Sequence, residues 1–136
     1  IIAHPLRLVC RPARTQGKTI LVTGAKMTKA YYICRSLSLR GYRVIAVECG
    51  VGFCTSSWSR HVDRFITVPD PSKDGLSAYL CALKQIMQDE DVDLVVPGVG
   101  IAEACPLARL YDEVPEKVFF CSSVMVDTLN DKNEFF

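Results

Sequence analysis

Residues 19 to 47 combine two short apolar segments with a helical pattern between them, and this order restricts the possible folds more than any other feature. Thr19–Thr23 is almost wholly apolar, as are strands that are buried on both faces of a parallel sheet. Tyr42–Val47 is a second segment of this kind. Between them, apolar residues recur at the i, i+3, i+4, i+7 spacing of one helix face: Ala30, Ile33, Cys34 and Leu37. The pattern predicts a βαβ unit with a right-handed crossover, whose helix is capped by Thr28 and ends before Gly41.

The same alternation continues through the rest of the chain. Further strands are expected at Arg64–Val68, Leu94–Val96 and Val118–Cys121. Further helices are expected at Leu76–Glu90, at Ile101–Tyr111, and from a cap at Ser122 or Ser123 through Leu129. Strands that alternate with helices predict an α/β fold, here a three-layer, Rossmann-like, doubly wound parallel sheet of about five strands. The expected spatial order of the strands is 3-2-1-4-5.

The composition fits one globular domain and argues against two kinds of partner. The chain has 136 residues, of which 49% are hydrophobic and 23% are charged. Its net charge of +1 provides no basic field for nucleic acid, so no nucleic-acid partner is expected. No apolar run reaches the roughly 18 residues that a membrane span requires.

Seven cysteines point to the compartment of the protein. Their number is odd, and no pair has the C-x-x-C spacing. Most of them stand in apolar patterns, as small buried hydrophobic residues do. The sequence therefore predicts a reducing, cytoplasmic environment, with neither a disulfide framework nor a zinc site.

The ends of the chain differ from its centre. Residues 1–18 carry two prolines and four basic residues without clear periodicity, and we expect a basic arm or linker. Such a segment is also compatible with a membrane anchor upstream. Residue 1 is Ile rather than Met, so we expect a processed chain or a piece of a longer one. The α/β domain is expected at residues 19–129, followed at 130–136 by the start of another domain.

The fold predicts where a ligand binds. In open α/β sheets, ligands lie outside the carboxyl ends of the strands, where the strand order reverses. This rule selects the loop Gly24–Thr28, the residue Glu48 and the loop Gly98–Gly100. The candidate substrate-binding residues among them are Gly24, Ala25, Lys26, Glu48, Gly98 and Gly100. The first of these loops precedes a helix, whose N-terminus favours anions. An equally simple interpretation is that Gly24 only makes a tight turn.

Several familiar motifs are incomplete. The stretch ILVTGA before a helix, with Glu48 downstream, resembles the start of an NAD(P)-binding Rossmann domain. The motif G-x-G-x-x-G needs further glycines, however, and residues 25–29 contain none. Gly17-Lys18-Thr19 imitates the end of a P-loop but precedes its strand instead of following it. No acidic cluster for Mg²⁺ and no catalytic set are apparent. An oxidoreductase domain and a stand-alone α/β interaction module remain the alternatives.

Four stretches carry a resemblance to a known family: KTILVTGAKMTKAYYICRSLSLRGYRVIAVE, SRHVDRFITVPDP, VDLVVPGVG and LNDKNEFF. Together they resemble the N-terminal, pre-ATP-grasp domain of ATP-grasp enzymes, in particular carbamoyl-phosphate-synthase-like proteins. The resemblance covers Lys18–Phe136, and TGAKMTKA and LNDKNEFF are its most specific parts. Many relatives have acidic or serine-rich residues after the proline of the fourth strand. This chain has Gly98-Val99-Gly100 there, which leaves only backbone contacts for a substrate.

The resemblance implies a function for the longer protein. Such enzymes activate a carboxylate as an acyl phosphate, which an amine or another nucleophile then attacks. ATP and Mg²⁺ are implied to bind in the later domains, so this chain alone is expected to be inactive. The implied partners are a following ATP-grasp domain of the same polypeptide and a small-molecule carboxylate, and a homodimer is compatible with the resemblance.

The last residues support a following domain. Asp131 and Glu134 have the spacing of a capping box, which predicts a helix that begins at Asp131. Phe135 and Phe136 are large apolar residues that a following domain is expected to cover. This expectation argues against the stand-alone interaction module.

Overall fold

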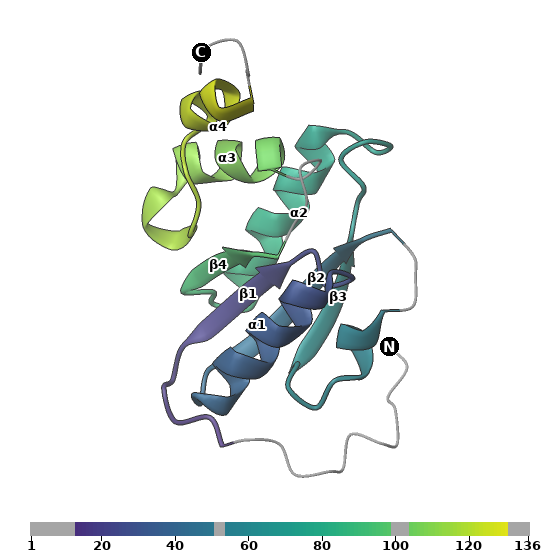
Figure 1. Ribbon diagram of the computed structural model, residues 1–136, viewed down its shortest axis with the longest axis vertical. Coiled ribbons are helices and arrows are strands. Elements are labelled where there is room, and N and C mark those ends of the chain that lie inside the picture. The colour runs from purple at the N-terminus through teal and green to yellow at the C-terminus, as the bar shows by residue number, and fades with distance from the viewer. Residues whose placement is uncertain (1–12, 51–53, 99–103, 131–136) are drawn as a thin grey trace.

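The computed structural model describes residues 13–50, 54–98 and 104–130 as one parallel α/β unit (Figure 1). All pairs of neighbouring strands in the sheet are parallel, and their spatial order is β3-β2-β1-β4. This order agrees with the one expected for the first four strands. The strands are β1 (Thr19–Thr23), β2 (Arg43–Cys49), β3 (Arg64–Val68) and β4 (Leu94–Pro97).

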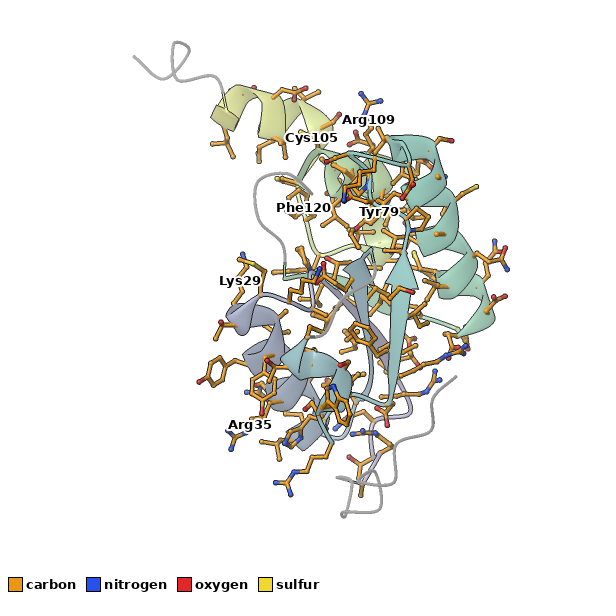
Figure 2. All side chains as sticks on the ribbon, turned by 90° about the vertical axis from the view of Figure 1, so that its right-hand side faces the viewer. Lys29, Arg35, Tyr79, Cys105, Arg109 and Phe120 are labelled. Atoms are coloured by element: carbon orange, nitrogen blue, oxygen red, sulfur yellow. The ribbon has the colours of Figure 1, made fainter. Side chains whose placement is uncertain are left out.

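Helices cover both faces of the sheet, as the three-layer prediction requires. One face carries α1, and the other carries α2 and α3, while α4 lies beyond α3 (Figure 1). Figure 2 shows Lys29 and Arg35 on the α1 side and Tyr79 on the opposite side. The helices are α1 (Thr28–Leu39), α2 (Leu76–Asp89), α3 (Ala104–Glu113) and α4 (Ser123–Asn130), with short 3-10 turns η2 (Thr55–Trp58) and η4 (Pro115–Lys117).

The central strands separate two hydrophobic clusters. Leu21 of β1 pairs with Ile45 of β2 and with Val95 of β4, and all three side chains pack on the α2 and α3 side. Val22 and Ala46, one residue further along, pack on the α1 side. Because side chains alternate between faces, a strand that is buried on both faces must be apolar throughout. This is why β1 and the middle of β2 could be recognised from the sequence.

The expected fifth strand is reduced to a single bridge. Val118 forms an isolated parallel bridge with Val95, and the amide of Phe119 donates to the Val95 carbonyl at 2.8 Å. The next amide, that of Phe120, donates to the carbonyl of Val118 at 2.9 Å. This local turn redirects the chain directly after the bridge, so the segment does not extend along β4. The position beside β4 is as predicted, but the strand over Val118–Cys121 is not formed.

The ends of α1 confirm one expectation and correct another. Gly41 follows the helix with a φ of +88°, the left-handed conformation expected of a C′ glycine. The predicted cap at Thr28 is wrong, because Thr28 is already helical and the N-cap is Met27, without a side-chain cap. The amide of Met27 donates to the carbonyl of Gly24 at 3.0 Å. This turn starts the helix one residue earlier than the sequence pattern predicts.

The described end of the basic arm lies against the domain. Arg14 forms an ion pair with Asp63 at 2.7 Å and donates to the Ser38 hydroxyl at 3.1 Å. The amide of Thr15 donates to the carbonyl of Gly41 at 3.0 Å. Arg14 and Thr15 thus attach this end of the arm to the α1 side of the sheet. Within the described ranges, no helix is both long and apolar enough to cross a membrane.

Candidate functional site

The predicted site residues lie at the carboxyl ends of β1, β2 and β4, which meet at one edge of the sheet, with Glu48 inside the end of β2. The chain passes to one side of β1 to form β2 and β3, and to the other side to form β4. In open α/β sheets, ligands bind at the carboxyl ends of the strands beside such a reversal. The candidate site is therefore built from the loops at this edge.

The loop between β1 and α1 has a fixed backbone. Gly24 has a φ of +66°, which side chains other than that of glycine rarely tolerate. The amide of Ala25 donates to the Val47 carbonyl at 3.1 Å, which ties the loop to β2. The hydroxyl of Ser56, which is buried, donates to the Ala25 carbonyl at 2.7 Å. The loop is therefore held from two sides before any ligand binds.

The carboxylate of Glu48 provides a further anchor. Its side chain is buried, and one oxygen accepts the Lys26 amide at 2.5 Å. The other oxygen accepts the amide of Cys49 at 3.0 Å. The structure thus brings Glu48 and the Gly24–Lys26 loop together, as the sequence analysis expects. Both carboxylate oxygens bind the backbone of the protein itself, so Glu48 orients the loop.

A pocket of about 420 Å³ opens beside this loop. We call it the edge pocket, and it is lined by Lys26, Cys54, Thr55 and Trp58. Lys26 comes from the loop after β1, and the other three come from the segment after β2. The pocket therefore combines an ammonium group, a hydroxyl group and an exposed indole ring, which suit an anionic ligand with an apolar or planar part.

Sequence reasoning found Lys26 but missed the other side of the edge pocket. η2 is a single 3-10 turn in an irregular stretch, so it has no periodic pattern that could be recognised. The available signal was the position of η2 after the carboxyl end of β2, where open α/β sheets bind ligands.

Of the two predicted glycines after β4, the structure describes Gly98. The amide of Gly98 donates to the carbonyl of Thr23 at 3.0 Å. A Cβ atom at position 98 would lie 2.5 Å from that carbonyl oxygen and 2.5 Å from the Cβ of Ala30. Glycine is therefore required here for the close approach of β4 to β1 and α1. Gly100 lies outside the described residues, and a substrate contact at either glycine stays a prediction.

The buried titratable groups near α1 serve packing. Burial raises the pKa of the Cys34 thiol to about 12, so this thiol is not a nucleophile at neutral pH. The pKa of His61 is lowered, first by burial and then by nearby arginines, so the ring is neutral at pH 7. Its Nδ1 atom lies 3.3 Å from the Ser38 hydroxyl oxygen. His61 is therefore a packing residue.

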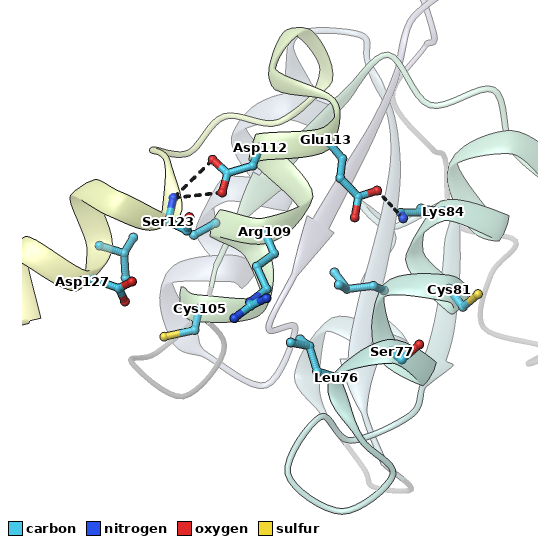
Figure 3. Close-up of a pocket in the computed structure, with 13 residues that line it drawn as sticks. Leu76, Ser77, Cys81, Lys84, Cys105, Arg109, Asp112, Glu113, Ser123 and Asp127 are labelled. Carbon is cyan, nitrogen blue, oxygen red and sulfur yellow. Dashed lines mark hydrogen bonds and ion pairs between the residues drawn. The ribbon is translucent and has the colours of Figure 1, made fainter.

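A larger pocket of about 740 Å³ lies among α2, α3 and α4 (Figure 3). Its wall includes the ion pair between Lys84 and Glu113, and the amide of Ser123 donates to Asp112 at 3.3 Å. None of its lining residues belongs to a strand or to the Gly24–Lys26 loop. No pattern in the sequence indicates this pocket, because the pocket depends on how α4 packs on α3. Its position on the helices separates it from the candidate site.

Comparison with solved structures identifies similar folds. The ADP-bound biotin carboxylase domain of a thermophilic 2-oxoglutarate carboxylase is 21% identical with a TM-score of 0.60, and the match covers 87% of this chain and 26% of that chain. The ADP complex of N5-carboxyaminoimidazole synthetase from Staphylococcus aureus is 16% identical with a TM-score of 0.57, covering 90% and 29%. The dTDP-glucose 4,6-dehydratase of Bacillus anthracis, in complex with NAD, is 16% identical with a TM-score of 0.53, covering 75% and 36%.

These matches define the class of fold. They confirm a Rossmann-like α/β fold, which is the fold that the resemblance to pre-ATP-grasp domains implies. The chain spans only 26% and 29% of the lengths of the two ADP-bound proteins. No protein-family model matches the sequence, and no curated protein matches it either.

Proposed function

We propose that this chain is the N-terminal, substrate-side domain of an ATP-grasp enzyme. The enzyme joins a carboxylate to an amine or a similar nucleophile, through an acyl phosphate formed from ATP. The main support is the combination of a pre-ATP-grasp type of fold with a backbone-anchored loop that presents Lys26 at the carboxyl edge. The chain is not catalytic by itself in this proposal.

The following domain of the same polypeptide would hold ATP and Mg²⁺. The positive charge at the edge pocket favours a role for this chain in binding the carboxylate substrate. Lys26 is exposed, and the first turn of α1 contains no acidic residue that would oppose an anion. The ammonium group of Lys26 would pair with the substrate carboxylate, while Trp58 would contact its apolar part.

The NAD(P)-binding alternative has weaker support. The match to the NAD-bound dehydratase has a lower TM-score and covers less of this chain than the matches to the two ADP-bound proteins. An acid at the end of the second strand would have to accept hydrogen bonds from the ribose. Both oxygens of Glu48 already accept backbone amides. The missing glycines after Gly24 argue in the same direction.

The experiment uses the full-length polypeptide encoded by its gene, with Mg·ATP and a panel of small carboxylates labelled with ¹⁸O. Transfer of ¹⁸O from a carboxylate to the released phosphate would identify the acyl phosphate. We expect Lys26→Met to lower kcat/KM for the carboxylate at least about tenfold, with little change in KM for ATP. The control is Lys18→Met, because Lys18 is exposed and precedes β1, at the opposite edge of the sheet from the site.

Two further results would decide between the candidates. We expect titration calorimetry of the 136-residue chain with Mg·ATP to show no micromolar binding. Binding of NADPH by the full-length protein, without any ATP-dependent phosphate release, would support the oxidoreductase instead. Normal activity of a well-folded Lys26→Met enzyme would remove this side chain from the site.

A further inference from the structure

Helix α4 exposes a continuous apolar surface. Val124, Met125 and Leu129 are 73%, 54% and 56% exposed, whereas Val126 is buried. At 100° per residue, Val124, Met125, Thr128 and Leu129 fall within an arc of about 140° on one side of the helix. The hydroxyl of Thr128 donates to the carbonyl of Val124 at 2.9 Å, so this polar group is satisfied by its own helix. We call these four residues the α4 apolar face.

This surface differs from the other exposed apolar residues. Five more large apolar side chains are exposed in the described part of the chain, but they are distributed over α1, η2 and two loops: Met27, Tyr32, Leu39, Trp58 and Phe119. Scattered apolar residues of this kind are normal on a protein surface. Three such residues on one side of an eight-residue helix form a patch, and a patch indicates a partner surface.

The rest of the described domain gives α4 limited support. Figure 1 shows α4 as the outermost helix, beyond α3 and away from the sheet. It is anchored by the buried side chain of Val126 and by the bond from the Ser123 amide to Asp112. A helix of eight residues is shorter than the about 12 that are marginal in water, so it depends on packing. Its apolar face adds nothing to that packing while it is exposed.

We propose that the α4 apolar face is the docking surface for the ATP-grasp domain that follows in the same polypeptide, which covers it with aliphatic and aromatic side chains. This inference rests on the proposed function. The ADP-bound proteins that share the fold continue for more than twice the length of the match. Residues 131–136 continue directly from α4 and span at most about 20 Å when extended, so a following domain would emerge beside this face.

The size of the surface favours a tethered partner over a second copy of the chain. Three side chains of this kind offer on the order of a few hundred Å². A stable interface between separate proteins buries roughly 800 Å² on each partner. A domain held by a short linker has an effective concentration in the millimolar range, so a small apolar face is sufficient for docking.

Hydroxyl-radical footprinting with mass spectrometry tests the proposal. Labelling of Met125 is compared between the 136-residue chain and the full-length polypeptide, with exposed Tyr32 on α1 as the reference. We expect Met125 labelling to fall at least about fivefold in the full-length protein, because a docked face excludes water, while Tyr32 labelling stays the same. Equal labelling of Met125 in both proteins would overturn the proposal.

A matched pair of variants provides a second readout. Leu129→Gln and Leu39→Gln each change an exposed leucine near the end of a helix. We expect Leu129→Gln to lower the melting temperature of the full-length protein by roughly 2–8 °C and to leave that of the 136-residue chain unchanged. We expect Leu39→Gln to change neither. Equal effects of the two variants would contradict docking at α4.

Other occupants of the face give distinct results. If Met125 is protected in the 136-residue chain and becomes exposed when residues 131–136 are deleted, that segment covers the face and the proposal is wrong. If the protection depends on protein concentration and accompanies a dimeric mass, a second copy covers it. None of these measurements uses ATP. A failure of the ligase function therefore remains distinguishable from a failure of the docking surface.

Discussion

Replacement of Glu48 tests whether a buried carboxylate fixes the loop between β1 and α1. In the structure, Glu48 accepts the amides of Lys26 and Cys49, at 2.5 Å and 3.0 Å. Hydrogen bonds to charged groups contribute roughly 1.5–3 kcal/mol each. Two effects reduce the combined contribution of these two hydrogen bonds. Burial of the carboxylate costs desolvation energy, and the Lys26 amide belongs to an exposed residue that water can reach in the variant.

We therefore expect Glu48→Ala to lower the free energy of unfolding by about 2–4 kcal/mol. Glu48→Gln keeps one carbonyl oxygen as an acceptor and loses the charge, so we expect about half of that effect. Urea unfolding, monitored by circular dichroism, measures both values. Hydrogen exchange adds the local information, since the Lys26 amide should exchange faster in Glu48→Ala, while the amides of Ile20 and Leu21 should stay protected.

The control for this experiment is Glu116→Ala. Glu116 is an exposed acid in η4 that belongs to no part of the site, so we expect a change within about 0.5 kcal/mol. If Glu48→Ala behaves like this control, and the exchange of the Lys26 amide is unchanged, the anchoring role of Glu48 is refuted.

Three further predictions concern buried groups around the site. The Thr23 hydroxyl is buried without a hydrogen-bond partner in the structure, so Thr23→Val should raise the free energy of unfolding by about 1 kcal/mol in urea, and a loss of stability would show that the hydroxyl has a partner. Gly98→Ala should lower the free energy of unfolding by about 1–3 kcal/mol, because the new Cβ would lie 2.5 Å from the Ala30 Cβ. An unchanged midpoint of urea unfolding would contradict this packing. The pKa of His61 is lowered from its ordinary value of 6.5, so the unfolded chain takes up this proton first as the pH falls. The free energy of unfolding should therefore decline below about pH 7. If His61 is the cause, the free energy of unfolding of the His61→Gln variant should decline less between about pH 7 and pH 5.

The fold was predictable where apolar patterns decide the structure. β1 and the middle of β2 are buried on both faces, so their composition alone identifies them as strands of a parallel sheet. The strand order β3-β2-β1-β4 agrees with the order predicted from the alternation of strands and helices. The segment at Val118 has an equally suitable composition, but the turn made by the Phe120 amide limits it to one bridge. Backbone hydrogen bonds of this kind leave no signal in the side-chain pattern.

The location of the candidate site could be predicted from the sequence, but only some of its residues could. The fold rule located the loop at Gly24 and the residue Glu48 at one edge, and the structure joins them by a hydrogen bond. The sequence could not show that this carboxylate binds the loop backbone, because the bond involves no side chain of Lys26. The contribution of Thr55 and Trp58 was missed for a related reason, since η2 is too short for periodicity.

The distribution of polar groups at the carboxyl edge is consistent with a supporting role for this domain. Glu48, Ser56 and the amide of Gly98 all bind the main chain and hold the loops in place. Of the residues on the Gly24–Lys26 loop, Lys26 is the one that lines the edge pocket. One cation beside an aromatic ring can bind and orient an anion, but phosphoryl transfer also requires metal ions and further positive charge on the phosphates. This difference supports the proposed division of labour, in which this domain would orient the carboxylate and a following domain would supply the nucleotide and the metal.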